Sequence, residues 1–148
     1  MTTEMDVLER LQETIIDCLV EPETVFDRNN VLIDYPDPDS MRKDTMVYIQ
    51  PDYGNYEELT TASDAATFDA TVFFVCKGAP SEKLVKRVFS CFSAFYGMLR
   101  SDNTLGGFID SSRITDMDYY PSLTASRTMT AIEAKVELQW ERRFNTRR

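Results

Sequence analysis

The residues of this chain with the most chemical potential are its carboxylates and its three cysteines, because the sequence contains no histidine. Histidine is the commonest general base and metal ligand, so its absence excludes every serine or cysteine triad that relies on imidazole. Cys18, Cys76 and Cys91 lie in apolar surroundings without Cys-x-x-Cys spacing, which indicates small buried side chains in a reducing compartment. Among the 25 acidic residues, no pair is singled out for glycoside chemistry.

No segment has the spacing of a nucleotide or calcium site. Gly106 and Gly107 are not followed by the Lys-Ser or Lys-Thr of a phosphate-binding loop. Asp34, Asp37 and Asp39 alternate around two prolines but lack the glycine and the terminal glutamate of an EF-hand, so solvated turn residues are the simpler interpretation. We therefore expect no catalytic residue, no cofactor, no metal and no enzymatic activity.

Length and composition predict one globular domain over residues 1–148. Hydrophobic residues make up 43% and charged residues 28%, without an apolar run long enough for a membrane span. The net charge of −9 argues against affinity for DNA, since proteins that bind phosphates collect Lys and Arg. Solubility is the simplest role of this charge, although an acidic channel would also let a duplex pass without adhering. The polar N-terminus lacks the pattern of a secretory signal, so we expect a cytoplasmic protein.

The predicted elements follow in the order αβββαββ. A helix is predicted over 4–19 with Thr3 as its N-cap. A second helix, capped by Ser81, carries an aromatic stripe that we expect in the core. Two of the strands, 31–35 and 45–50, are predicted to form a hairpin. This order predicts an α+β fold, a small antiparallel or mixed sheet with both helices packed on one face. The five strands are expected over 31–35, 45–50, 70–77, 108–117 and 130–141.

The last strand has the clearest pattern in the sequence, because apolar and polar residues alternate without interruption. One face should pack against the core, and the other should remain exposed to solvent. A short basic tail, 142–148, is expected to follow the strand. The apolar face holds Ile132, Ala134, Val136, Leu138 and Trp140, and the polar face holds Glu133, Lys135, Glu137 and Gln139.

Residues 52–69 show no sustained periodicity and predict a long exposed loop, which in a compact domain is usually functional or disordered. Exposed tyrosines are typical of protein interfaces, with partial burial under their own loops as the alternative. Arginines near the C-terminus contrast with the acidic body and suit head-to-tail contacts that close rings. The candidate interface residues are Tyr53, Tyr56, Glu57, Glu58, Tyr119, Tyr120, Arg142 and Arg143.

The segment from Ser81 to Arg143 resembles the tail terminator (tail completion) proteins of long-tailed bacteriophages. The resemblance rests on the end of the aromatic helix, Leu-Arg-Ser-Asp at 99–102, and on the Asn-Thr-Leu-Gly-Gly that follows at 103–107. A strand, a polar span and the final Ala-Lys-Val-Glu-Leu-Gln-Trp-Glu-Arg strand complete it. The resemblance in architecture extends over most of the chain. Its sequence motifs are structural rather than catalytic.

The resemblance implies a subunit of a ring, commonly a hexamer, at the head-proximal end of the tail tube. Such a ring ends tube polymerisation and provides the head-tail joining surface. Its partners would be further copies, the tail tube protein and the head completion or connector protein, with DNA passing through without sequence-specific binding and no membrane involved. The protein would be assembled in the host cytoplasm and end in the virion.

Two alternatives stay open at this point. Another ring component of the phage neck or tail, such as a head completion or tail tube protein, would differ in which surfaces polymerise. A small-molecule binding module would instead use the cleft between the aromatic helix and the sheet.

Overall fold

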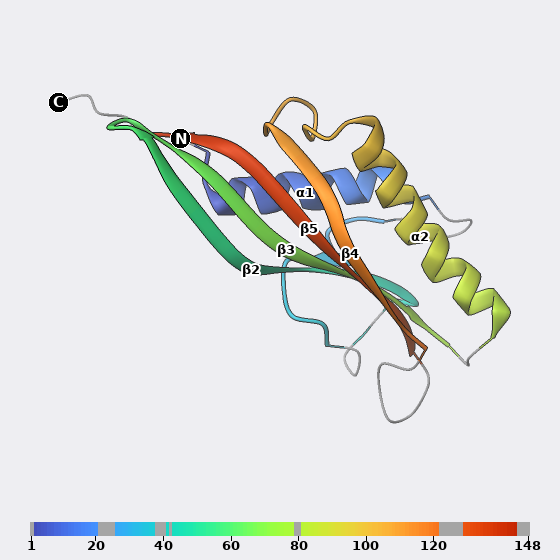
Figure 1. The fold of residues 1–148 in the computed structure, drawn as a ribbon. Coiled ribbons are helices and arrows are strands. Elements are labelled where there is room, and N and C mark those ends of the chain that lie inside the picture. The colour runs from blue at the N-terminus through green and yellow to red at the C-terminus, as the bar shows by residue number, and fades with distance from the viewer. Residues whose placement is uncertain are drawn as a thin grey trace.

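The computed structural model of the chain describes residues 2–20, 26–37, 41, 43–78, 81–121 and 129–144, and Figure 1 shows the arrangement of its elements. These residues form two helices and a five-stranded mixed sheet, which confirms the predicted α+β class and the order αβββαββ. The elements are α1 (Glu4–Cys18), β1 (Val31–Leu32), β2 (Thr45–Thr60), β3 (Ser63–Lys77), α2 (Glu82–Ser101), β4 (Ser111–Tyr120) and β5 (Met129–Arg143).

The strands lie side by side in the order β1-β2-β3-β5-β4, so β3 occupies the centre. β1 runs parallel to β2, and every other neighbouring pair is antiparallel. The predicted hairpin of the first two strands is therefore wrong. A tight turn can join two antiparallel strands but not two parallel ones.

The predicted loop over 52–69 is also wrong, because β2 and β3 form one long hairpin through these residues. Thr61 and Ala62 make the turn, which the hydroxyls of Thr60 and Ser63 close at 2.9 Å. No glycine or asparagine marks this turn, so the usual hairpin signal is missing. The inward positions of β3 in this segment are Asp64, Ala66 and Phe68, a mixed set that shows no apolar period in the sequence.

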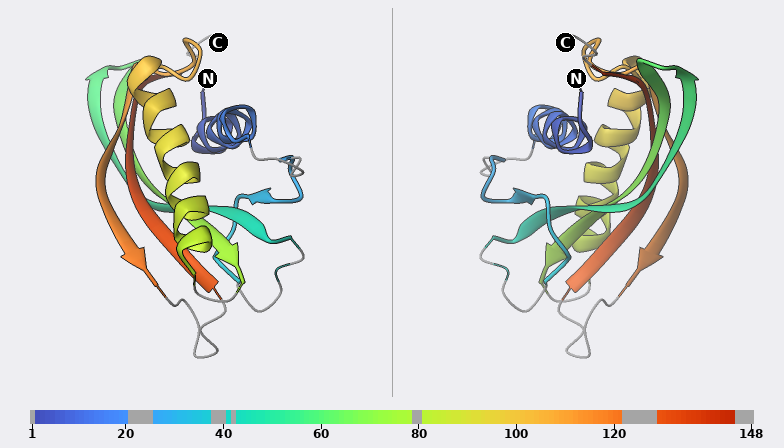
Figure 2. Two further views of the ribbon diagram at one scale, coloured as in Figure 1. Left: turned by 90° about the vertical axis from the view of Figure 1, so that its right-hand side faces the viewer. Right: turned by 90° about the vertical axis from the view of Figure 1, so that its left-hand side faces the viewer.

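Both helices lie on the concave face of the curved sheet, and Figure 2 shows the strands bending around them. The main core lies between the helices and this face. Phe95 of α2 is fully buried against Phe74 of β3, with ring centroids 5.7 Å apart. Phe89 and Phe92 are half-buried at the margin of the core, so the aromatic stripe is only partly an interior feature.

The alternation predicted for the last strand is confirmed by β5. All five residues of its apolar face are buried against the helices, with at most 3% of the residue exposed. The face predicted to be exposed to solvent is half-buried at Glu133, Lys135 and Glu137 and exposed at Gln139. The pattern thus fixed which side of β5 meets the core, as a period of two requires.

The helix starts follow from local sequence. Thr3 and Asp6 form a capping box, in which the Asp6 amide donates to the Thr3 hydroxyl at 3.2 Å and the Thr3 amide donates to the Asp6 carboxylate at 2.8 Å. Ser81 caps α2 by accepting a hydrogen bond from the Leu84 amide at 3.2 Å. Both caps were predicted from the sequence.

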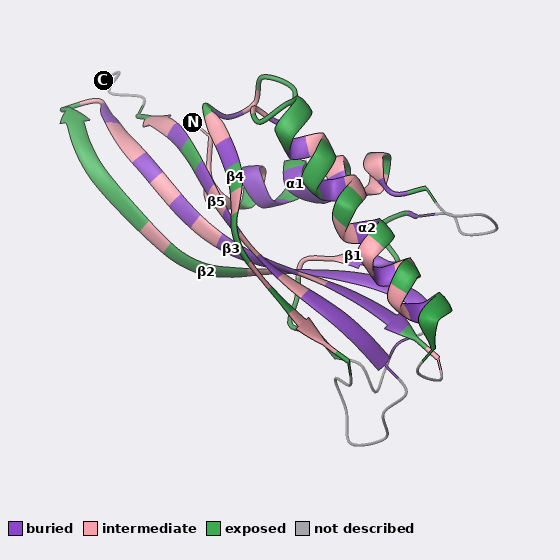
Figure 3. Ribbon diagram, turned by 45° about the vertical axis from the view of Figure 1, so that its right-hand side comes forward, coloured by how far each residue is buried: buried purple, intermediate pink, exposed green. Residues whose placement is uncertain are grey.

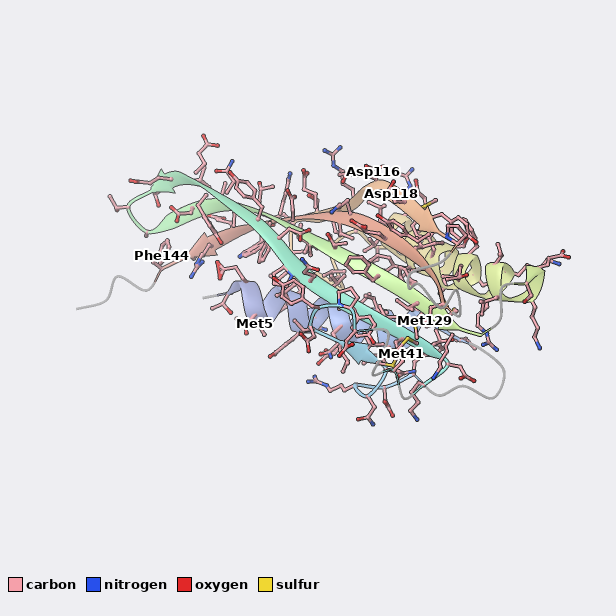
Figure 4. All side chains as sticks on the ribbon, turned by 90° about the horizontal axis from the view of Figure 1, so that it is seen from below. Met5, Met41, Asp116, Asp118, Met129 and Phe144 are labelled. Atoms are coloured by element: carbon pink, nitrogen blue, oxygen red, sulfur yellow. The ribbon has the colours of Figure 1, made fainter. Side chains whose placement is uncertain are left out.

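A second, smaller apolar cluster covers one end of the convex face of the sheet. Met41 and Met129 lie close together there (Figure 4), over Tyr48 and Val75. No helix covers the rest of this face within the described residues. The convex face beyond this cluster is therefore a polar sheet surface.

Candidate assembly surfaces

The hairpin of β2 and β3 extends past the start of β4, because Ser111 of β4 lies level with Gln139 and Thr67. We call residues 56–66, which lie beyond this level, the hairpin tip. Glu57 and Glu58 are exposed there, and Leu59 is 52% exposed. The tip is thus an acidic projection with one exposed aliphatic side chain.

Tyr53 and Tyr56, both predicted as interface residues, point to opposite faces of β2. Tyr53 lies opposite Asp69 on the convex face and is 63% exposed. Tyr56 lies on the concave side, where its hydroxyl donates to Glu4 at the start of α1 at 2.7 Å. Tyr53 therefore has the freer ring, and Tyr56 serves partly to tie the hairpin tip to the helix.

Arg142 and Arg143 are not part of a tail, because β5 continues through both residues. The remainder of the expected basic tail, 145–148, lies outside the described residues. Arg142 forms an ion pair with Glu4, and its guanidinium stacks over the rings of Tyr56 and Phe144. We call Glu4, Tyr56 and Arg142 the Glu4 cluster. Arg143 differs, since its side chain is 78% exposed and pairs with Glu141 at 3.1 Å.

The electrostatics of the Glu4 cluster favour an ionised glutamate. Burial alone would raise the pKa of Glu4, but the hydrogen bonds from Tyr56 and Arg142 outweigh it and lower this pKa. Burial and the bond to Glu4 in turn raise the pKa of Tyr56. The backbone adds to the same junction, since the Phe144 amide donates to the Ala62 carbonyl at 2.7 Å. The hairpin tip is thus held to the N-terminal end of α1.

Tyr119 and Tyr120 lie at the opposite end of the sheet from the hairpin tip. Tyr119 packs against Phe89 of α2 with ring centroids 5.4 Å apart, and Tyr120 donates its hydroxyl to Glu133 at 2.8 Å. Both residues are half-buried. The structure therefore divides the predicted interface residues into two groups and brings only Tyr56, Glu57, Glu58, Arg142 and Arg143 together.

The sheet has two open edges of different sequence. β1 pairs with β2 only at Val47 and Tyr48, so among the described residues no strand pairs with 49–60 on the side away from β3. Figure 3 shows β2 exposed over most of 51–60, whereas β3 beside it alternates between buried and half-buried residues. The second open edge is β4, the last strand of the sheet. Open edges carry unpaired backbone donors and acceptors that can bind another strand.

Both edges carry features that limit indiscriminate pairing. β2 has Pro51 and a register shift between Pro51 and Tyr53, and β4 has a shift between Ile114 and Asp116. Asp116 and Asp118 of β4 lie on the side of the sheet away from α1 (Figure 4). Bulges, proline and charge are the usual protection of edge strands, and they leave room for a partner of complementary shape.

A hydrogen-bonded network crosses four strands on the convex face. The Thr71 hydroxyl donates to Asp52, and Lys135 donates to Thr71 at 3.2 Å. Lys135 also pairs with Glu133 at 2.9 Å, and Glu133 accepts the Tyr120 hydroxyl. The bond to Glu133 is the main cause that raises the pKa of Lys135. The amine is therefore held in its charged form and cannot act as a nucleophile at neutral pH.

The convex face as a whole is acidic. Burial, together with the nearby Glu137 and Asp52, raises the pKa of Asp69, as expected where carboxylates crowd on one surface. Only a few basic side chains, chiefly Arg113, Lys135 and Arg143, lie among them. The strand register places these carboxylates on that face: Asp52, Glu57, Asp69, Asp118, Glu133, Glu137 and Glu141.

A hollow of about 610 Å³ lies between the C-terminal half of α2 and the start of β4. Arg100 and Tyr96 line it from the helix, and Arg113 lines it from the strand. Tyr96 is 44% exposed, and the Arg113 side chain is 71% exposed. The sequence analysis named a cleft between the aromatic helix and the sheet, but it identified none of these lining residues. Nothing in the local pattern places the end of a helix beside the start of a later strand.

Two features of the described residues bear on metal binding and on cysteine reactivity. No group of three or more acidic or cysteine side chains is placed to hold a metal ion within them. Burial raises the pKa of the Cys18 thiol to about 11, so it is not a ready nucleophile. Neither helix of the described chain has the length and apolar character needed to cross a membrane.

No protein-family model matches this sequence, and no curated protein matches it either.

Proposed function

We propose that this protein is a structural virion protein that forms a ring, a hexamer by the resemblance, at the head-proximal end of a phage tail tube. The ring ends polymerisation of the tube and presents the surface that joins the tail to the head. Its partners in this role are further copies of the chain, the tail tube protein and the head completion or connector protein. Its place is the virion, after assembly in the host cytoplasm.

The observation that carries this proposal is the pair of unlike open edges on one sheet. One edge is 49–60 of β2, and the other is β4, at the far side of the sheet. Two different surfaces on opposite sides of a subunit favour heterologous contacts, which close into a ring when the rotation between copies allows it. A subunit with one edge would instead favour a two-fold dimer.

The acidic convex face supports the same role. With both helices on the concave side, a ring built by joining the sheets can turn its helix-free face toward the central channel. Carboxylates such as Glu133 and Glu137 on that face would repel the phosphates of passing DNA. This arrangement lets a duplex pass without adhering and needs no cofactor.

Electron microscopy of the purified protein, alone and mixed with tail tubes, tests the proposal. We expect rings of uniform diameter, and with tubes present we expect them on one end only. A protein that stays monomeric at every concentration, with and without tubes, contradicts the proposal. Extension into long tubes would instead assign the chain to the alternative class of tail tube proteins.

The hollow between α2 and β4 favours a second candidate function, a small-molecule binding module. Its polar lining, with Arg100 and Arg113, would suit an anionic metabolite. A ligand that binds only the folded protein at 100 times its dissociation constant adds about 2.7 kcal/mol to stability. A thermal shift with a panel of anionic metabolites separates the two functions, and we expect no shift if the hollow serves assembly.

A further inference from the structure

We propose that the hollow beside the start of β4 receives the hairpin tip of a neighbouring copy, with Glu57 and Glu58 facing Arg100 and Arg113. This inference rests on the proposed ring and identifies the subunit contact that builds it. The occupant of the hollow is thus a second copy of this chain rather than a small molecule.

Strand direction brings these segments together. β2, β3, β5 and β4 alternate in direction across the sheet, so β4 runs opposite to β2. In a ring, all subunits keep one orientation relative to the axis, so β4 of one copy meets β2 of the next in antiparallel fashion. Ser111, the first residue of β4, then lies toward Thr60, the end of the neighbour's β2.

The lengths of the two edges agree with this pairing. β4 has 10 residues, and the open part of β2 runs over 49–60. β1 occupies the edge at Val47 and Tyr48, so the neighbour's β4 can pair only beyond that point. The hairpin tip is therefore carried to the first residues of β4, and these residues line the hollow.

The charges at the two surfaces are complementary. Glu57 and Glu58 are exposed at the tip, whereas Arg100 and Arg113 line the hollow. Arg113 donates through Nε to Glu137 at 3.3 Å, which leaves the other guanidinium nitrogens for a further carboxylate. A two-fold contact between two hairpin tips would instead place these glutamates against each other, at a cost in electrostatic free energy.

The apolar side chains at the two surfaces match as well. Leu59 at the tip is 52% exposed, and Tyr96 in the hollow is 44% exposed. A leucine packed on a tyrosine ring is a common interface contact, and it would bury two exposed side chains at once.

Charge reversal tests the contact. We expect Glu57→Arg with Glu58→Arg, and separately Arg100→Glu with Arg113→Glu, to weaken self-association more than about tenfold. A mixture of the two variants should assemble, because opposite charges meet at every interface when the variants alternate. The basic tip of the first variant meets the acidic hollow of the second, and the unchanged tip of the second meets the unchanged hollow of the first. Lys83→Glu with Lys86→Glu is the matched control for the arginine pair, since it makes the same change in net charge on exposed positions of α2. Sedimentation velocity measures the association, and circular dichroism checks the fold.

A cross-linking experiment gives an independent measurement. Glu57 and Arg113 share the convex face of the sheet, so they are the pair to cross-link. Glu57→Cys and Arg113→Cys are each expected to give no disulfide dimer alone, whereas their mixture should give a heterodimer under mild oxidation. Wild-type protein, with its buried and half-buried cysteines, is the control. A dimer from Glu57→Cys alone would show a two-fold contact between tips and overturn the inference.

The outcomes separate this inference from the proposed function. If wild-type rings form but both charge reversals assemble normally, the contact is wrong and the ring stands. If the wild-type protein does not form rings under any condition, with or without tubes, both are wrong. An anionic metabolite that binds the hollow and leaves ring formation unchanged also overturns the contact.

Discussion

Glu4, in the first turn of α1, forms an ion pair with Arg142, near the end of β5, across 138 positions of sequence. The same carboxylate accepts the hydroxyl of Tyr56 from β2. One acidic side chain therefore joins the first helix to the two strands that flank β3 near the hairpin tip. This cluster decides how firmly the proposed assembly surface is held to the body of the subunit.

Replacing Arg142 should destabilise the domain, whereas replacing its neighbour should not. We expect Arg142→Ala to lower the free energy of unfolding by about 1–2 kcal/mol, because a charge-assisted bond to Glu4 and the packing on two rings are lost. Arg143→Ala should cost less than about 0.5 kcal/mol, since its ion pair is exposed. Urea unfolding of both variants measures the difference. Equal losses for the two would show that the Glu4 cluster contributes nothing to stability.

Acid should weaken the same cluster. The pKa of Glu4 is lowered in the folded protein, so its ionisation contributes stability that is fully present above the ordinary pKa of about 4.3. That contribution is lost as the pH falls through the lower pKa of the folded state. We therefore expect the stability difference between wild-type and Glu4→Gln protein to be constant from pH 7 to 5 and to shrink below pH 4.3. A difference that grows on acidification would contradict the assigned direction.

The stability lost on replacing an aromatic residue of α2 should depend on how deeply that residue is buried. Phe95→Ala should cost about 3–5 kcal/mol, because the ring is fully buried and its removal leaves a cavity beside Phe74. Phe92 is half-buried, so Phe92→Ala should cost less. Thermal and urea unfolding of the two variants check the order. A Phe92 variant that keeps its melting temperature but fails in assembly would place this residue at an interface.

The wild-type protein should not bind duplex DNA. The net charge of −9 and the carboxylates of the convex face both oppose contact with phosphates. In a gel retardation experiment at physiological salt we expect no shifted band at any protein concentration. Retardation that disappears at high salt would assign the basic C-terminal residues to phosphate binding and would exclude a non-adhesive channel.

The sequence by itself determined the elements whose side chains repeat with a period. The alternation from Ile132 to Trp140 set the inward face of β5, and spacings of three and four set the buried face of α2. The helix caps at Thr3 and Ser81 could also be predicted from the sequence, because a cap depends only on residues within one turn of the helix. These features follow from local geometry, which is the same wherever the element sits in the fold.

The hairpin over 52–69 was decided by tertiary structure. Outer β2 is exposed on both faces, so its side chains carry no period, and it is a strand because its backbone pairs with β3. The parallel placement of β1 likewise depends on its packing with α1, where the Gln12 amide donates to the Val31 carbonyl at 2.6 Å. Backbone hydrogen bonds are available to every residue, so they leave little trace in the sequence.

The proposed assembly surfaces depend on the tertiary structure in the same way. Glu57 and Glu58 were identified from the sequence as exposed acidic residues, but their place at the end of a projecting hairpin was not. Arg100 and Arg113 were missed, since only the packing of α2 beside β4 brings them to one hollow. A sequence pattern records which face of an element is buried, whereas the distance between two elements is set by how their faces pack together.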